Sequence, residues 1–375
     1  MKHFNMVPSR KWYVGACCSL LLLFSAPGIS FSYNVTNITA TYHNGQTFLT
    51  WNNAGATNLQ YNVYRSTNKF TSSSQLTASK LLGFVRDNSS KNIHISQDQQ
   101  ADVFYRIEDN GVPLSANKGL YVITCTGNQP YYYAVTVTDL SNNTEAKNLI
   151  PGKNSMTAPV NEFVAKPQPV LQDSITVSDG EKKYRYVQFG NNQETPLYPA
   201  MNSTGSYGFN FYIVKRGSST SYPLMVVYEG SASKTTDGPG LDGSVTNCYI
   251  LGVEDWLPIP SGDGDIGVGD NTYFCCYHEN FNIYSTDNPK PTSGSVKTYP
   301  QKRYIEAIRW AKNHFPIDAT RVYTKGVSAT GFGALLTAEL YPNEIAAYNG
   351  TVEPMFVKPV GSKGDLYEQM WGLSS

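Results

Sequence analysis

The sequence predicts a chain of two domains, in which an all-β sandwich precedes a C-terminally incomplete, doubly wound parallel α/β sheet. Three observations support this fold class. Short strand-like runs of period two, separated by turn residues, fill the first part of the chain. A continuous apolar run at residues 223–228 then indicates a strand that is buried on both faces. Residues 321–336 combine a strand, a tight turn and a helix. The length of 375 residues leaves room for both domains.

Residues 1–32 have the pattern of a signal peptide. Lys2, Arg10 and Lys11 precede an apolar run at residues 14–26, and small residues suit cleavage before Tyr33. The apolar run is too short to span a bilayer by itself. We therefore expect a secreted protein, either extracellular or periplasmic.

The charge composition bears on the partners of the chain. It has 29 basic and 29 acidic residues, and its pI is near 6.9. A neutral surface attracts neither nucleic acid nor an anionic membrane. Because no later apolar run is long enough to cross a bilayer, we expect no membrane partner after signal cleavage and no nucleic-acid partner.

Four cysteines remain after the signal peptide: Cys125, Cys248, Cys275 and Cys276. Export permits disulfides, and Cys248 with Cys275 or Cys276 is the favoured bridge. The alternative is that all four are small buried residues. No Cys or His spacing suggests zinc.

One acidic segment resembles a calcium loop in composition. Residues 261–271 place Asp263, Asp265 and Asp270 among glycines. The segment lacks the spacing and the bidentate Glu of an EF-hand. We therefore favour a plain surface loop, and we expect no metal and no cofactor.

The predicted first domain, residues 33–156, opens with a β-hairpin. Strand-like residues 38–42 and 47–51 flank the turn His43-Asn44-Gly45. No helical pattern is recognised between the later runs, and the polar residues 70–100 give no clear strands. Further strands are expected at residues 59–64, 104–107, 120–125 and 131–138.

Three motifs of this domain resemble a fibronectin type III module: LTW at 49–51, YNVYRS at 61–66 and PYYYAVTVTD at 130–139. The resemblance implies that Trp51 lies in the core and that one tyrosine of residues 131–133 forms a tyrosine corner. Such modules in exported enzymes are spacers or weak substrate-binding attachments. The proline-containing residues 157–173 then predict a semi-stiff linker.

The predicted second domain, residues 174–375, changes pattern. Apolar strands now alternate with a helical period, which predicts a doubly wound α/β sheet. The expected elements are strands at 184–189, 209–215, 223–228, 272–277 and 345–352, and a helix at 299–314.

The turn within residues 321–336 has the layout of a nucleophile elbow, with Ser328 at its tip. Such a serine has a strained backbone, so the residues two before and two after it must be small. Gly326 fills the first place, and Thr330 fills the second, where glycine is usual. The alternative interpretation is that Ser328 only caps a helix.

The second domain, from PLMVVYEG at 223–230 through the elbow, resembles the α/β-hydrolase fold. Within that fold it resembles secreted esterases of the feruloyl-esterase and polyhydroxybutyrate-depolymerase kind. The resemblance implies that Ser328 is the nucleophile. It also implies an oxyanion hole made by the amide of Ala329 and one amide from Gly230 or Ser231. Glu229 stands where relatives often carry His, which leaves the detail of that loop open.

The catalytic histidine of this fold follows the nucleophile, but here the last histidine, His314, precedes Ser328. His278 and Glu279 follow a predicted strand and could line the site, although a surface or capping role is favoured for His278. Glu353 follows the strand after the elbow, where some hydrolases carry the acid. A serine without a base is a poor nucleophile, so we expect this chain to be inactive as given.

The sequence therefore indicates a secreted serine hydrolase of carboxylic esters, acting on an ester or polysaccharide substrate. Two rival interpretations remain. A serine peptidase of the same fold would carry propeller or lid attachments, which the sequence does not show. A non-catalytic binding or adhesion protein with a degenerate hydrolase domain would explain the absent histidine. A fragment of a longer enzyme would reconcile the intact elbow with that absence.

Overall fold

A computed structural model describes residues 33–176, 180–228, 245–260, 269–351 and 364–372. Residues Tyr33–Ser375 form one compact unit, separate from Met1–Ser32. The predicted signal peptide, Gly230, Ser231, Glu353, Asp263 and Asp265 lie outside the described residues.

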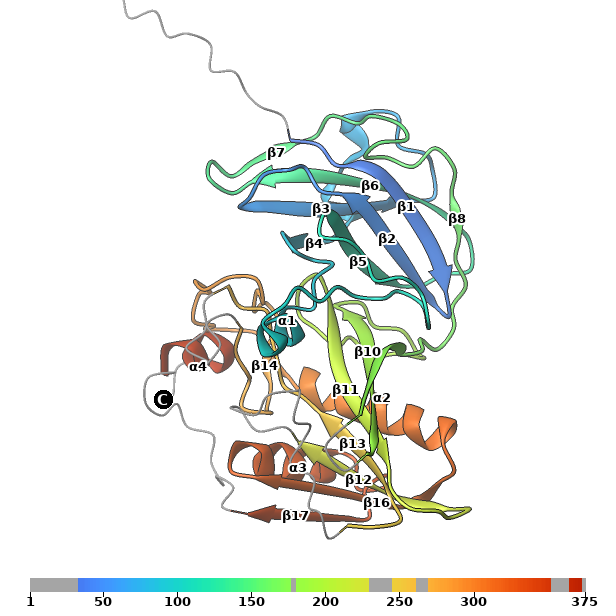
Figure 1. Ribbon diagram of the computed structural model, residues 1–375. Coiled ribbons are helices and arrows are strands. Elements are labelled where there is room, and N and C mark those ends of the chain that lie inside the picture. Colours follow the sequence, from blue (N-terminus) through green and yellow to red (C-terminus); the bar gives the residue numbers. More distant parts are fainter. Residues whose placement is uncertain (1–32, 177–179, 229–244, 261–268, 352–363, 373–375) are drawn as a thin grey trace, which may run out of the picture. The chain divides into compact units, whose positions relative to one another are not determined.

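The first half consists of antiparallel strands in two sheets (Figure 1). Trp51, Tyr61 and Tyr133 are fully buried between them, in one hydrophobic cluster. The hairpin turn is confirmed, because Asn44 and Gly45 both have positive φ (45° and 76°). One sheet contains β1 (Thr36–His43), β2 (Gln46–Asn52) and β5 (Lys118–Thr124). The other contains β4 (Leu81–Arg86), β3 (Leu59–Ser66), β6 (Pro130–Asp139) and β7 (Thr144–Ala146), and β8 (Val160–Asn161) pairs with β6.

Two expectations for this half were wrong. Residues 104–107 form no strand but only a single bridge between Phe104 and Lys91. The polar residues 70–100 contain β4 and the helix α1 (Ile93–Gln99), besides two short 3₁₀ turns. The side chain of Asn92 caps α1 by accepting a hydrogen bond from the amide of Ile95 at 3.3 Å. A seven-residue helix gives too weak a periodic signal to be recognised in the sequence.

The second half is built on a seven-stranded sheet in the order β17-β16-β12-β13-β11-β10-β9 (Figure 1). Strands β17, β16, β12 and β13 run parallel, and β11, β10 and β9 continue the sheet antiparallel. This mixed sheet confirms the predicted α/β class with parallel strands, whereas helices on both faces, which a doubly wound sheet has, stay a prediction. The strands are β9 (Val170–Thr176), β10 (Lys182–Asn191), β11 (Ser206–Lys215), β12 (Tyr222–Tyr228), β13 (Tyr249–Val253), β16 (Ile317–Val327) and β17 (Ala347–Thr351).

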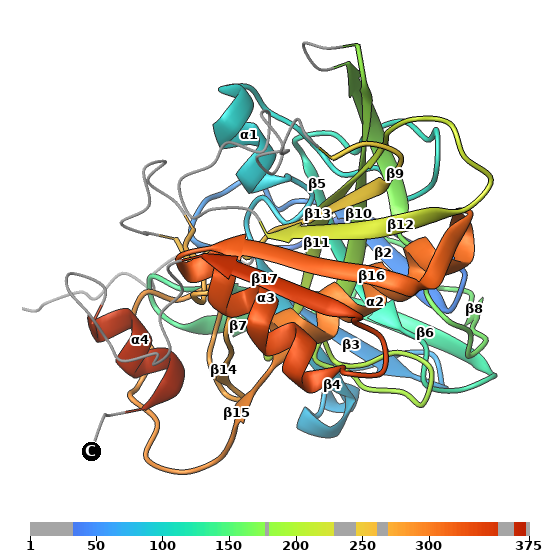
Figure 2. The same ribbon diagram turned by 90° about the horizontal axis from the view of Figure 1, so that it is seen from below.

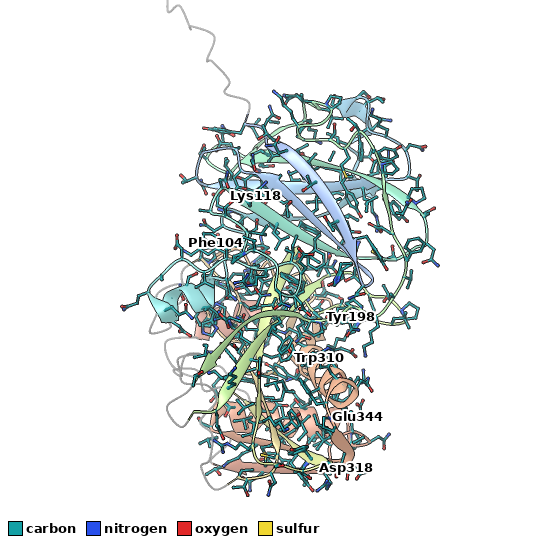
Figure 3. All side chains as sticks on the ribbon, turned by 45° about the vertical axis from the view of Figure 1, so that its right-hand side comes forward. Phe104, Lys118, Tyr198, Trp310, Asp318 and Glu344 are labelled. Atoms are coloured by element: carbon teal, nitrogen blue, oxygen red, sulfur yellow. The ribbon has the colours of Figure 1, made fainter. Side chains whose placement is uncertain are left out.

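Helices α2 (Tyr299–His314) and α3 (Ala329–Leu340) lie on the same face of the parallel strands (Figure 2). Helix α2 connects β13 to β16, and α3 connects β16 to β17, so both connections run towards the β17 edge of the sheet. Right-handed crossovers that run in the same direction place their helices on the same face. Trp310 of α2 packs on Phe211 of β11. Arg309, also in α2, donates hydrogen bonds to Glu344, which follows α3 (Trp310 and Glu344 are labelled in Figure 3). A further helix, α4, spans Gly364–Trp371.

The strand expected at residues 272–277 was wrong, and the strand β13 was not predicted. Residues 272–275 form a turn in which Tyr273 and Phe274 have positive φ (60° and 54°). The carboxylate of Asp255 holds this turn by accepting hydrogen bonds from the amides of Thr272 and Phe274, both at 2.7 Å. Only Tyr277–His278 (β14) is extended, paired with Val296–Lys297 (β15). The apolar run is therefore buried by packing, not by a ladder of strands.

The predicted linker, residues 157–173, contains strands at both ends. Its β8 pairs with β6 of the first half, and β9 begins inside it and joins the seven-stranded sheet. The two halves also bond directly, since the hydroxyl of Tyr105 donates to the carbonyl of Gly208 at 3.0 Å. Hydrophobic clusters likewise contain residues of both halves.

The favoured disulfide was also wrong, because all four cysteines are free thiols. Cys248 precedes β13, whereas the turn that carries Cys275 is held by Asp255, beyond the other end of that strand. Seven extended residues span roughly 20 Å, and a disulfide requires Cα atoms within about 7 Å.

Candidate active site

Ser328 stands between β16 and α3 with an unusual backbone conformation, φ 57° and ψ −129°. A non-glycine residue in such a region costs on the order of 1–3 kcal/mol, so the surroundings must hold it there. The amide of Ser328 donates to the carbonyl of Thr351 in β17 at 2.9 Å, and its carbonyl accepts from the amide of Phe332 at 3.2 Å. Ser328 is nevertheless exposed. This is the geometry that a nucleophile elbow requires.

Two glycines make room for the turn. A Cβ added at Gly326 would lie 2.1 Å from the carbonyl oxygen of Thr330, which no side chain can tolerate. A Cβ added at Gly333 would lie 2.4 Å from Cβ of Phe274. Gly326 therefore lets the strand pass the first turn of α3, and Gly333 lets α3 lie against the turn that Asp255 holds.

Thr330 occupies the place where glycine was expected, and its hydroxyl explains how the elbow accepts it. The side chain is buried, and its Oγ1 accepts from the amide of Val327 at 2.7 Å. The same oxygen donates to the carbonyl of Val327 at 2.8 Å. Thr330 thus satisfies both backbone groups of the residue before Ser328, which stabilises the strained turn.

The amide of Ala329 is the first N–H of α3. Among the described residues it has no hydrogen-bond acceptor, as is usual for the first turn of a helix. Partial positive charge gathers at this end of the helix, so an oxyanion formed on a substrate bound to Ser328 would be stabilised here. The second donor was expected from Gly230 or Ser231, which the structure does not describe.

His278 and Glu279 do not reach this site through any contact that the structure shows. Both ring nitrogens of His278 are occupied within its own hairpin. Its Nε2 donates to the carbonyl of Ser293 at 2.8 Å, and its Nδ1 accepts from the amide of Asn280 at 3.2 Å. Glu279 accepts from the amide of Ser295 at 3.0 Å. Their observed role is to hold the β14–β15 hairpin.

A buried pair at the same edge of the sheet was missed in the sequence. Glu254 directly follows β13, and its Oε2 lies 2.7 Å from Nδ1 of His94, a residue of α1 in the first half. His94 also stacks on Trp256, with ring centroids 4.1 Å apart and planes 3° from parallel. Since β13 itself was not predicted, nothing placed Glu254 at the end of a strand.

The sheet register relates this pair to Ser328. Val253 pairs with Tyr228 across β13 and β12, and Val227 pairs with Lys325 across β12 and β16. Glu254 is therefore level with the residue before Ser328, roughly 10 Å away at two strand spacings. Its Oε1 accepts from Asn210 of β11, on the far side of β13. The Glu254 carboxylate thus points away from Ser328.

Asp255 and Arg303 form a buried charge pair, 3.6 Å apart. Burial raises the pKa of the Asp255 carboxyl, and Arg303 together with the hydrogen bonds from residues 272–274 opposes that rise. The guanidinium of Arg303 also lies 4.1 Å from the centroid of the Phe209 ring. This pair fixes the turn that packs against α3.

Two searches for other functional features concern only the residues that the structure describes. Within them, no three His, Cys, Asp or Glu side chains are grouped closely enough to hold a metal ion. In the same part of the chain, no helix combines the length and apolar character needed to cross a bilayer.

No protein-family model matches the chain, and no curated protein matches it. Solved structures resemble it partially. An S-formylglutathione hydrolase from Agrobacterium tumefaciens has a TM-score of 0.38 at 12% identity, over 54% of this chain and 68% of that chain. An acetyl xylan esterase from Paenibacillus sp. R4 has a TM-score of 0.29 at 16% identity, over 48% and 51%. A glucuronoyl esterase from Teredinibacter turnerae has a TM-score of 0.31 at 13% identity, over 55% and 52%.

The chain thus spans about half the length of these two esterases. All three TM-scores are low. The strand order and the turn at Ser328, rather than these likenesses, agree with the α/β-hydrolase-like arrangement that the sequence of the second half implies. No fibronectin type III protein is among these structures, so that assignment of the first half stays a prediction.

Proposed function

We propose that this chain carries the nucleophile of a serine carboxylic-ester hydrolase, with Ser328 as that nucleophile. The observation that carries the proposal is the backbone of Ser328, which is strained, exposed and placed at the N-terminus of α3. A serine that only capped the helix would need neither the positive φ nor the exposure, and its side chain makes no capping hydrogen bond.

The chemistry would follow the acyl-enzyme route. Oγ of Ser328 attacks the ester carbonyl, and the amide of Ala329 stabilises the oxyanion of the tetrahedral intermediate. Loss of the alcohol leaves an acyl group on Ser328, and water then releases the acid. The family resemblance of the sequence favours esters linked to polysaccharide as substrates.

The proton of Ser328 needs an acceptor. The described histidines are His43, His94, His278 and His314, and none of them has a contact with Ser328 that the structure shows. We therefore propose that this chain alone acylates slowly. An oxyanion hole without a base gives on the order of 10³–10⁴-fold catalysis over water in enzymes that lack their triad.

The alternative function is that of a non-catalytic binding protein, and the engagement of His94 and His278 elsewhere favours it. A labelling experiment separates the two. Ser328 should react slowly with a fluorophosphonate, and imidazole added as an external base should accelerate that reaction. The Ser328→Ala variant should show no labelling, whereas Ser74→Ala, at an exposed serine of the first half, should behave like the wild type.

Hydrolysis of p-nitrophenyl acetate should be little above background, with an imidazole-dependent excess that disappears in Ser328→Ala. No labelling at any imidazole concentration would support the binding protein. Rapid stoichiometric labelling without imidazole would show that the chain contains its own base, and it would disprove the proposed slow acylation.

A further inference from the structure

The turn between β13 and α2 carries two adjacent cysteines that the proposed ester hydrolysis does not use. Cys275 is buried, Cys276 is half-buried, and both are free thiols. They follow Tyr273 and Phe274, the two residues with positive φ. The pair therefore lies at the end of a turn whose backbone is already bent sharply.

Contacts on both sides fix this turn. The Asp255 carboxylate binds the amide of Phe274 at 2.7 Å, and the side chain of Gln301 donates to the carbonyl of Phe274. After the pair, the carbonyl of Cys276 accepts from Nε1 of Trp371 in α4 at 2.7 Å. These contacts hold the backbone on both sides of the pair, so movement of the loop does not carry the two thiol groups away from each other.

The two thiols differ in their surroundings. A hydrogen bond to Cys276, together with burial, raises the pKa of the Cys275 thiol far above its usual value. Cys275 thus ionises less readily than an ordinary thiol, and the more accessible Cys276 is the thiol that a reagent in solution meets first. Because an external disulfide reaches the exposed part of this pair first, the reaction begins at Cys276.

We propose that Cys275 and Cys276 form a reversible redox pair that closes to a vicinal disulfide. The oxidant is a small-molecule disulfide such as oxidised glutathione. The Cys276 thiolate attacks it, forming a mixed disulfide and releasing one reduced thiol. Cys275 then loses its proton to solvent and attacks Sγ of Cys276, which releases the second reduced thiol. Two protein thiols are oxidised and one external disulfide is reduced.

The geometry of adjacent residues makes this disulfide reducible. Neighbouring Cα atoms lie about 3.8 Å apart, whereas disulfide-bonded residues usually have Cα atoms about 4.4–6.8 Å apart. The bond is therefore strained, and strained disulfides have the higher reduction potentials typical of labile bridges. Cys248, which lies beyond the other end of β13, cannot compete for either thiol.

Peptide analysis of the intact chain tests the proposal. Protein incubated with oxidised glutathione is alkylated without reduction and cleaved with chymotrypsin after Phe274 and Tyr277, which flank the pair. We expect the fragment Cys275-Cys276-Tyr277 to be unalkylated and lighter by two hydrogen atoms. After reduction it should carry two alkyl groups. Recovery of the doubly alkylated fragment from the oxidised sample would overturn the proposal, as would a bridge from Cys276 to Cys248.

Binding of phenylarsine oxide to the reduced protein provides a second test, because one arsenic atom replaces both thiol protons of a close pair and releases water. Cys275→Ser and Cys276→Ser should each abolish tight binding, whereas Cys248→Ser should retain it. Equal binding by all three variants would contradict the close pairing. If the first two variants do not fold, the fragment analysis of the wild type decides.

Discussion

Nδ1 of His94 lies 2.7 Å from Oε2 of Glu254, and both side chains are buried. These residues belong to different halves of the chain, since His94 lies in α1 and Glu254 follows β13. Asn92, the cap of α1, bonds to Asn210 of β11 beside them at 2.6 Å. The first half is therefore anchored at the edge of the sheet where Ser328 also lies.

Removing one member of this pair should destabilise the whole chain. His94→Ala leaves Oε2 of the buried Glu254 without its His94 partner, and an unsatisfied buried polar group costs about 1–3 kcal/mol. Urea unfolding measures the loss. His43→Ala, at an exposed histidine of the first half, should change the unfolding free energy by less than about 0.5 kcal/mol. Equal stabilities of the two variants would show that the pair contributes nothing.

The hydroxyl of Thr330 gives a second prediction. Thr330→Val keeps the shape of the side chain but leaves the amide and carbonyl of Val327 without their partner, at a cost of about 1–3 kcal/mol. Thr330→Ser keeps the hydroxyl and should lose much less. Thermal unfolding compares the two variants, and fluorophosphonate labelling should fall further in the valine variant. A valine variant as stable as the serine one would disprove the role of the hydroxyl.

The buried carboxyl of Asp255 predicts a pH dependence of stability. Burial raises the pKa of this carboxyl in the folded state above its unfolded value, so folding favours the protonated form. Its contribution to stability is present below about pH 4 and is lost as the pH rises through the folded pKa. Asp255→Asn stays neutral and keeps an acceptor for the amides of Thr272 and Phe274.

Urea unfolding at several pH values should therefore show the wild type losing stability relative to Asp255→Asn as the pH rises above about 4. A difference that is constant with pH would mean that Arg303 fully compensates the buried charge. A difference that grows in the opposite direction would contradict the raised pKa.

Glu162 predicts how the segment between the halves responds to protease. Its carboxylate is fully buried and accepts hydrogen bonds from Thr47 at 2.9 Å and from Tyr133. Glu162→Ala should release this segment, so chymotrypsin should cut after the exposed Phe163 several-fold faster than in the wild type. Glu108→Ala, at an exposed glutamate, is the matched control. Rapid cleavage of the wild type into two stable fragments would instead support a free linker.

Local patterns predicted much of the fold. Helix α2 was placed at its observed bounds because its period is clear and Pro316 ends it. The turn at Ser328 was recognised because its signals are local: a glycine, a serine and the start of a helix follow one another within a few residues. The position of Ser328 in a turn before a helix was therefore expected from the sequence alone, and its catalytic role stays a prediction. The hairpin turn was found for the same reason.

Tertiary contacts decided the features that were missed. The apolar run at 272–277 reads like a strand, but the Asp255 carboxylate bends it into a turn, and Asp255 lies 17 residues away from Thr272. His94 and Glu254 are 160 residues apart, so no pattern in a window of sequence can join them. The strands β8 and β9 were not predicted in residues 157–173. The prolines there indicate only a stiff chain, and the strands that pair with β8 and β9 lie elsewhere in the sequence.

The cluster of Phe48, Leu120 and Val122 with Val187 and Phe189 also has a consequence for synthesis on the ribosome. The first three residues emerge before the strand that covers them has been translated. At about 5–20 residues per second, their apolar surface waits seconds for β10. The nascent first half therefore exposes apolar surface during that interval, and such transiently exposed surface favours aggregation until the remainder follows.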